Sequence, residues 1–86
     1  MLELIPRDHE HNGKVYIPVW AYYTSDGRIK PLAIRIGDEY FKIDRILDIR
    51  PGASRKLGGA GMRYLCRVEG KELELYLEEN RWFMEA

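Results

Sequence analysis

Apolar and charged residues alternate along residues 63–77, with one interruption at Gly70 and Lys71, and few folds accept such a pattern. Successive side chains of a β-strand point to opposite faces, so the pattern predicts a hairpin with one apolar and one charged face. A two-residue turn at Gly70 and Lys71 places opposite charges across the strands, and a slip of one residue would invert every side chain. The predicted pairs are Val68 with Leu73, Cys66 with Leu75 and Tyr64 with Leu77 on the apolar face, and Arg67 with Glu74, Leu65 with Tyr76 and Arg63 with Glu78 on the other.

A second hairpin is predicted around Asp26 and Gly27, a strong signal for a two-residue turn. One face of this hairpin would be apolar, with Ala21 against Leu32, Val19 against Ile34 and Ile17 against Ile36. The opposite face would carry Tyr22 against Pro31, Trp20 against Ala33 and Pro18 against Arg35.

Each hairpin is followed by a third strand. After Gly37 and Asp38 the chain is expected to set Phe41 on Ile34 and Ile43 on Leu32. After Glu79 and Asn80 it is expected to set Trp82 on Leu77 and Met84 on Leu75. Successive residues of a strand direct their backbone groups alternately to its two neighbouring strands. Given the positions of the first turns, this alternation predicts a four-residue loop before each third strand, at residues 36–39 and 78–81.

The alternation fails after Ile43, because the apolar residues that follow it are out of phase. Pro31 has no N–H and would lie opposite Asp44 at the same place, so a bend or bulge is predicted there. Pro18 is expected to point its missing donor away from its hairpin partner, as suits an edge strand. The chain is therefore predicted to be all-β: one domain over residues 1–86, irregular at 1–13, and a small barrel or sandwich in the SH3-like style, with about six strands in two three-stranded antiparallel meanders.

Composition limits the class of function. The formal charge of zero argues against a general nucleic-acid coat protein, although residues 49–68 carry five bases and no acid. No signal-peptide pattern and no apolar run of about 20 residues is present, so we expect no membrane association. Cys66 is the single cysteine, which excludes an internal disulfide and favours a cytoplasmic location.

The most unusual stretch is the glycine-rich segment at residues 51–63. Glycines allow a backbone to approach a phosphate closely, and neighbouring bases could supply charge. No Gly-Lys-Ser/Thr follows the glycines, so the segment is not a Walker loop, and a flexible connection between two sheets is the favoured interpretation. The candidate binding residues here are Arg55, Lys56, Gly58, Gly59 and Gly61.

Aromatic side chains provide the second candidate. Tyr16, Trp20 and Tyr22 would share one face of the second hairpin, with Tyr40 beside Arg35. Small β domains use such faces to stack bases or to grip peptides. A covering layer formed by residues 1–6, or a dimer contact, would account for the same pattern.

Catalytic and metal-binding patterns are weak. His9 and His11 could share one face of an extended segment, but structural zinc usually takes four ligands. Asp44 and Asp48 could be imagined as paired carboxylates, but charged residues at a strand end are usually just solvated. Cys66 is expected in the core against Leu75. We therefore expect no enzyme, no metal and no cofactor.

The run at residues 43–68, with Gly70, Lys71 and residues 81–85 after it, resembles a family of short proteins of unknown function from clostridia and related Gram-positive bacteria. The resemblance covers roughly residues 14–86, and Gly-Gly-x-Gly-x-Arg-Tyr at 58–64 is its most specific part. It implies a bacterial cytosolic protein and carries over no activity, cofactor or catalytic residue.

Together these features predict a non-enzymatic binding or adaptor module that recognises a protein partner or associates with itself. The alternative is single-stranded nucleic-acid binding through the aromatic sheet face and the basic glycine-rich loop. The two differ in their response to salt, because phosphate contacts weaken steeply as salt rises and apolar docking does not.

Overall fold

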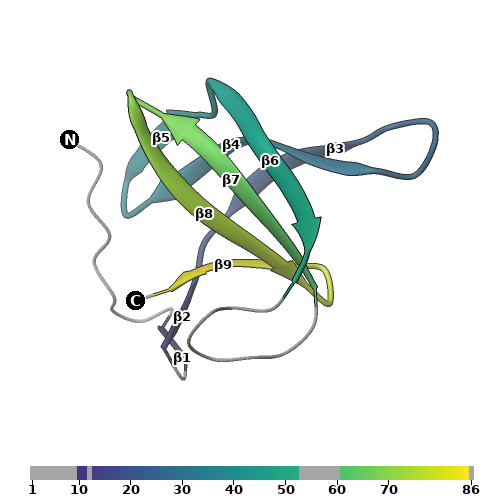
Figure 1. Ribbon diagram of the computed structural model, residues 1–86. Coiled ribbons are helices and arrows are strands. Elements are labelled where there is room, and N and C mark those ends of the chain that lie inside the picture. Colours follow the sequence, from purple (N-terminus) through teal and green to yellow (C-terminus); the bar gives the residue numbers. More distant parts are fainter. Residues whose placement is uncertain (1–9, 12, 53–60, 86) are drawn as a thin grey trace.

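The computed structural model describes residues 10, 11, 13–52 and 61–85, which form nine β-strands in two antiparallel sheets and no helix (Figure 1). The all-β prediction is therefore confirmed. The strands are β1 (Glu10–His11), β2 (Lys14–Tyr16), β3 (Val19–Tyr23), β4 (Ile29–Ile36), β5 (Glu39–Lys42), β6 (Arg45–Pro51), β7 (Met62–Val68), β8 (Lys71–Glu78) and β9 (Arg81–Glu85).

The smaller sheet has the order β3-β4-β5, and the larger has the order β1-β2-β9-β8-β7-β6. Both predicted meanders are present, as β3-β4-β5 and β7-β8-β9. The short strand β1 lies within residues 1–13, which were expected to be irregular, and it pairs with β2. No closed barrel is found among the described residues, which pair as two sheets.

The chain passes from one sheet to the other at two bends. At the first, the N–H of Ile17 donates to Trp82 in the larger sheet, and the carbonyl of Pro18 accepts from Arg35 in the smaller one. At the second, the N–H of Ile43 donates to Leu32. The next N–H, that of Asp44, donates to Arg67 across the larger sheet. This confirms the bend predicted after Ile43.

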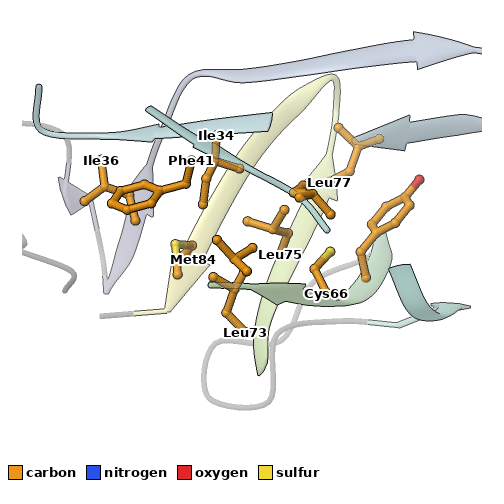
Figure 2. Close-up of a cluster of buried hydrophobic side chains, with 11 residues drawn as sticks. Ile34, Ile36, Phe41, Cys66, Leu73, Leu75, Leu77 and Met84 are labelled. Carbon is orange, nitrogen blue, oxygen red and sulfur yellow. The ribbon is translucent and has the colours of Figure 1, made fainter. Parts of the chain in front are cut away.

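The core lies between the two sheets (Figure 2). Ile34 and Phe41 from the smaller sheet meet Cys66, Leu75 and other side chains of the larger one. The hydroxyl of Tyr64 donates to the carbonyl of Ile29 at 2.6 Å, so a polar contact also joins the sheets. Burial of these side chains from both sheets is the main contribution to the stability of the domain.

The hairpin β7-β8 has the predicted faces but not the predicted register. Its turn is Glu69 and Gly70, both with positive φ (51° and 74°), one residue earlier than expected. Two-residue turns with positive φ at both positions match the twist of antiparallel strands. The pairs shift by two residues, which leaves each side chain on its face. Cys66 lies opposite Leu73, Tyr64 opposite Leu75, Arg67 opposite Glu72 and Leu65 opposite Glu74.

The hairpin β3-β4 follows the prediction at one end only. Val19 pairs with Ile34 and Trp20 with Ala33, as expected, but the register then shifts, and Ala21 pairs with Pro31. Leu32 is the extra residue. Its side chain is 47% exposed, so the prediction that it lies in the core is wrong, while Pro31 is buried. The turn is correspondingly longer than expected, because the N–H of Thr24 donates to the carbonyl of Arg28.

Both second turns are shorter than the predicted four-residue loops. Ile36 pairs with Glu39, and Glu78 pairs with Arg81, so each loop has two residues. The parity rule holds. In β8 the displaced first turn changes the phase by one residue, and in β4 the register shift does the same. The predicted contacts of Ile34 with Phe41 and of Leu77 with Trp82 are confirmed.

Two further details concern the strand edges. A second register shift lies between Ile46 and Asp48 in β6, which explains why Leu47 breaks the apolar alternation. Pro18 precedes β3, an edge strand of its sheet, but its carbonyl faces β4, so the prediction that its missing donor points away from the hairpin partner is wrong.

Gly61 is needed for the chain to enter β7. Its φ is 144°, and a Cβ there would overlap the carbonyl oxygen of Leu77. Gly61→Ala should therefore lower the free energy of unfolding by at least about 2 kcal/mol, through backbone strain and steric overlap. Urea unfolding of both proteins measures this loss.

Gly52→Ala is the matched control, because the Gly52 N–H donates to the Gly61 carbonyl and its own Cβ position is open. This variant should change stability by less than about 0.5 kcal/mol, as substitutions at unstrained surface positions usually do. Equal effects of the two substitutions would contradict a special geometry at Gly61.

Candidate binding surface

The smaller sheet exposes aromatic and basic side chains on its outer face. The register puts Trp20, Ala33 and Lys42 in one row across the three strands, and Arg35 and Tyr40 in the next. Tyr22 and Lys30 form a third row beyond the register shift. We call this surface the aromatic-basic face; it consists of Trp20, Tyr22, Lys30, Leu32, Arg35, Tyr40 and Lys42.

Two of its rings contact one another. The centroids of Trp20 and Tyr40 lie 5.3 Å apart at an interplanar angle of 70°, the edge-to-face arrangement that aromatic pairs favour. Trp20 comes from β3 and Tyr40 from β5, so the pair reaches across β4. The β4 residue opposite Trp20 is Ala33, which is only 1% exposed although it belongs to the outer face. A small side chain at this position leaves room for the two rings to meet.

The charges on this face have one sign. Lys30, Arg35 and Lys42 contribute three bases, and the face contains no acid. Within the part of the chain that the structure describes, none of these bases forms an ion pair; the recorded ion pairs involve Lys14, Arg28, Arg50, Arg63 and Arg67. The aromatic-basic face therefore presents unneutralised positive charge beside exposed rings.

The structure brings together part of the predicted site. Trp20, Tyr22, Arg35 and Tyr40 share the aromatic-basic face, as expected. Tyr16 does not join them, because it lies in the larger sheet, 5.7 Å from the Phe83 ring and 3.6 Å from the Arg81 guanidinium. The candidates Arg55, Lys56, Gly58 and Gly59 lie outside the described residues, and Gly61 has the structural role given above.

Sequence reasoning missed three members of this face. Lys42 follows from the correctly predicted pairing of Ile34 with Phe41, which implies that Ala33 lies opposite Lys42. Lys30 and Leu32 could not be found in this way, because the register shift in β4 changes which side chains point outward.

A second aromatic cluster covers the outer face of the larger sheet, which was expected to be mainly charged. Tyr76 stacks on Phe83 with centroids 5.2 Å apart, and both side chains are buried. Ion pairs flank the cluster: Lys14 with Glu78 at 2.8 Å, and Arg63 with Glu74. A small open pocket lies beside it, lined by Glu74, Tyr76, Met84 and Glu85. The cluster is packed and ion-paired, which is typical of a structural surface.

The candidate catalytic groups are engaged separately. Asp44 accepts a hydrogen bond from the Glu69 N–H at 3.1 Å, while Asp48 accepts one from Arg50 at 2.7 Å. Cys66 is buried in the core, as predicted, and burial raises the pKa of its thiol to about 12. A buried, protonated thiol is a poor nucleophile.

Metal-ligating side chains do not gather in the described residues, which hold no group of three or more His, Cys, Asp or Glu side chains placed to share an ion. His9 and the side chain of His11 lie outside that part of the structure. The described residues also contain no helix that is long and apolar enough to cross a membrane.

Comparison with known proteins found no matching family model, no matching curated protein and no matching solved structure. A function can therefore be inferred only from the residues of this chain.

The buried thiol predicts a loss of stability at alkaline pH. The pKa of Cys66 is raised to about 12 in the folded protein from an ordinary value of 9.0, so below pH 9 both states keep the proton. Above pH 9 only the unfolded thiol ionises, which should favour unfolding by up to about 1.4 kcal/mol per pH unit. Urea unfolding between about pH 7.5 and pH 10.5 measures this slope.

Cys66→Ala provides the comparison. Burial also raises the pKa of Tyr64 and of Tyr76, so some alkaline loss should remain in the variant. We expect Cys66→Ala to be less stable at neutral pH, and to lose less stability than the wild type as the pH rises. Identical slopes for the two proteins would contradict this account of the thiol.

Proposed function

We propose that this protein is a non-enzymatic binding module that recognises a protein partner through the aromatic-basic face. The observation that carries the proposal is the gathering of Trp20, Tyr22, Tyr40 and Arg35 on one exposed face of the smaller sheet. Tryptophan, tyrosine and arginine are the residue types that dominate binding energy at protein interfaces.

The charges of the face support a partner of opposite charge. Lys30, Arg35 and Lys42 surround the rings with no acid among them, so a segment with acidic side chains would be complementary. Leu32 is 47% exposed next to the rings and supplies an apolar contact. The proposed ligand is therefore a protein segment that combines acidic and apolar side chains.

Single-stranded nucleic acid is the second candidate, because Lys30, Arg35 and Lys42 alternate with rings on which bases could stack. Two features favour the protein partner. Trp20 and Tyr40 already contact each other edge to face, which leaves less ring surface for stacking. The chain as a whole has zero formal charge, so it lacks the general basic character of nucleic-acid-binding domains.

Two finer expectations belong to this proposal. We interpret the domain as barrel-like, in the SH3-like style, and the support is that the chain runs from one sheet into the other at both Pro18 and Ile43. We also place the module in the cytoplasm, where the single cysteine of the sequence would remain a thiol.

A random-peptide display library, selected on the full chain, tests the proposal. Selected peptides should combine acidic and apolar residues, and Trp20→Ala should weaken their binding by about 30-fold, the loss typical of an interface hot spot. Lys42→Ala should weaken binding by roughly two- to fivefold, as removal of one exposed charge contact does. Isothermal titration calorimetry with a synthesised peptide gives both values.

Lys71→Ala is the matched control, because Lys71 is also an exposed strand lysine but lies in the larger sheet. It should leave binding unchanged. Peptides that bind wild type and Trp20→Ala equally would contradict the proposal. Binding of a ten-nucleotide oligothymidine that involves Trp20 and fades as salt rises would support the second candidate instead.

A further inference from the structure

The strand β3 has an open edge. It is the outermost strand of the smaller sheet, and its only pairing partner among the described strands is β4. In Figure 1 the hairpin β3-β4 projects away from the rest of the domain. An open strand edge presents unpaired N–H and C=O groups to which another strand can add.

The hydrogen bonds at the two ends of β3 define which residues face this edge. The carbonyl of Pro18 accepts from Arg35, and the N–H of Thr24 donates to Arg28, so the even-numbered residues face β4. The N–H of Ile17 donates away from β4, to Trp82. Because backbone groups alternate along a strand, those of Val19, Ala21 and Tyr23 point outward, beyond the end of β9.

This edge lacks the charged residues and proline that commonly protect an edge against strand addition. Natural edge strands carry charged residues or proline, and every other outermost strand of the two sheets does so: β1 contains Glu10, β5 contains Glu39 and Lys42, and β6 contains three charged residues and Pro51. The sequence of β3 is Val-Trp-Ala-Tyr-Tyr, with neither a charge nor a proline. Tyr23 at its end is 69% exposed.

The sequence of β3 is also complementary to itself. A two-fold axis at Ala21 would place Ala21 opposite Ala21 of a second copy and Trp20 opposite Tyr22 of that copy. Val19 would lie opposite Tyr23. Aromatic pairs and pairs of aromatic with β-branched residues are the favourable neighbours across antiparallel strands. No charged side chain would oppose another of the same sign, because β3 has none.

We propose that two copies of this chain associate through antiparallel pairing of their β3 strands, with Val19, Ala21 and Tyr23 forming the intermolecular hydrogen bonds. The two three-stranded sheets would then form one six-stranded sheet. Such an isologous contact uses the same edge on both copies. Both aromatic-basic faces would lie on the same side of that sheet, so a partner would meet a surface twice as wide. The proposal concerns the strand edge and does not depend on what binds the face.

Sedimentation equilibrium of the wild-type chain tests the association. Five-residue strands form a contact below the roughly 1,200 Å² of standard interfaces, so we expect a dimer with a dissociation constant on the order of 10–100 µM. Ala21→Pro removes an outward N–H while leaving the bonds to β4 intact, and should weaken the dimer at least about tenfold.

Lys42→Pro is the matched control. The Lys42 N–H also points outward from an edge strand, because the neighbouring Ile43 N–H donates to β4, and this variant should dimerise as the wild type does. A wild-type chain that stays monomeric at 1 mM, or a dimer that is equally stable in Ala21→Pro, would overturn the proposal.

An NMR measurement keeps the test decisive if Ala21→Pro does not fold. In a mixture of labelled and unlabelled wild-type chains, isotope-filtered spectra should show contacts between the Hα of Trp20 and the Hα of Tyr22 in the other copy. Such contacts are characteristic of the non-hydrogen-bonded pairs of antiparallel strands. Intermolecular contacts from a different surface would contradict pairing through β3.

Discussion

The register shift between β3 and β4 determines which side chains of the smaller sheet are exposed to solvent. Between Trp20 and Ala21 the strand β3 advances one residue while β4 advances two, from Ala33 to Pro31. The extra residue, Leu32, leaves the core and becomes exposed, and Pro31 takes a buried place. Without this shift Leu32 would fill the core, and the exposed surface would lose the apolar side chain that lies among its rings and bases.

The remaining structure holds that shifted hairpin in place. The bend at Pro18 carries the chain from the larger sheet into β3, and the bend at Ile43 carries it back from β5 into the larger sheet; the core packs Ile34 and Phe41 against that sheet. The Tyr64 hydroxyl donates to the carbonyl of Ile29, which begins β4. The hairpin is therefore fixed near its base by packing and near its turn by a hydrogen bond, while its aromatic residues Trp20 and Tyr22 remain exposed to a ligand or a second copy.

Much of the fold could be predicted from the sequence, because alternation and turn residues are local signals. Alternation in residues 63–77 defined the two faces correctly, and the break after Ile43 located a bend. The exact register of β7-β8 could not be predicted, because two alternative turns fit the sequence. A turn at Gly70 and Lys71 and a turn at Glu69 and Gly70 give the strands the same faces. Leu32 was misplaced because a bulge leaves no distinct pattern in an apolar run. Of the aromatic-basic face, four members were predicted, since their positions depend only on strand parity near correctly predicted pairs: Trp20, Tyr22, Arg35 and Tyr40.

The register shift places Leu32 outside and Ile34 inside, although both are aliphatic residues of the same strand. Exposure of their methyl groups to a soluble paramagnetic probe, measured by methyl NMR of the full chain, separates the two environments. The register shift predicts strong broadening of the Leu32 methyl signals and little change for Ile34, which is fully buried. Protected Leu32 methyls would mean that β4 continues without a shift, and would contradict the composition of the aromatic-basic face.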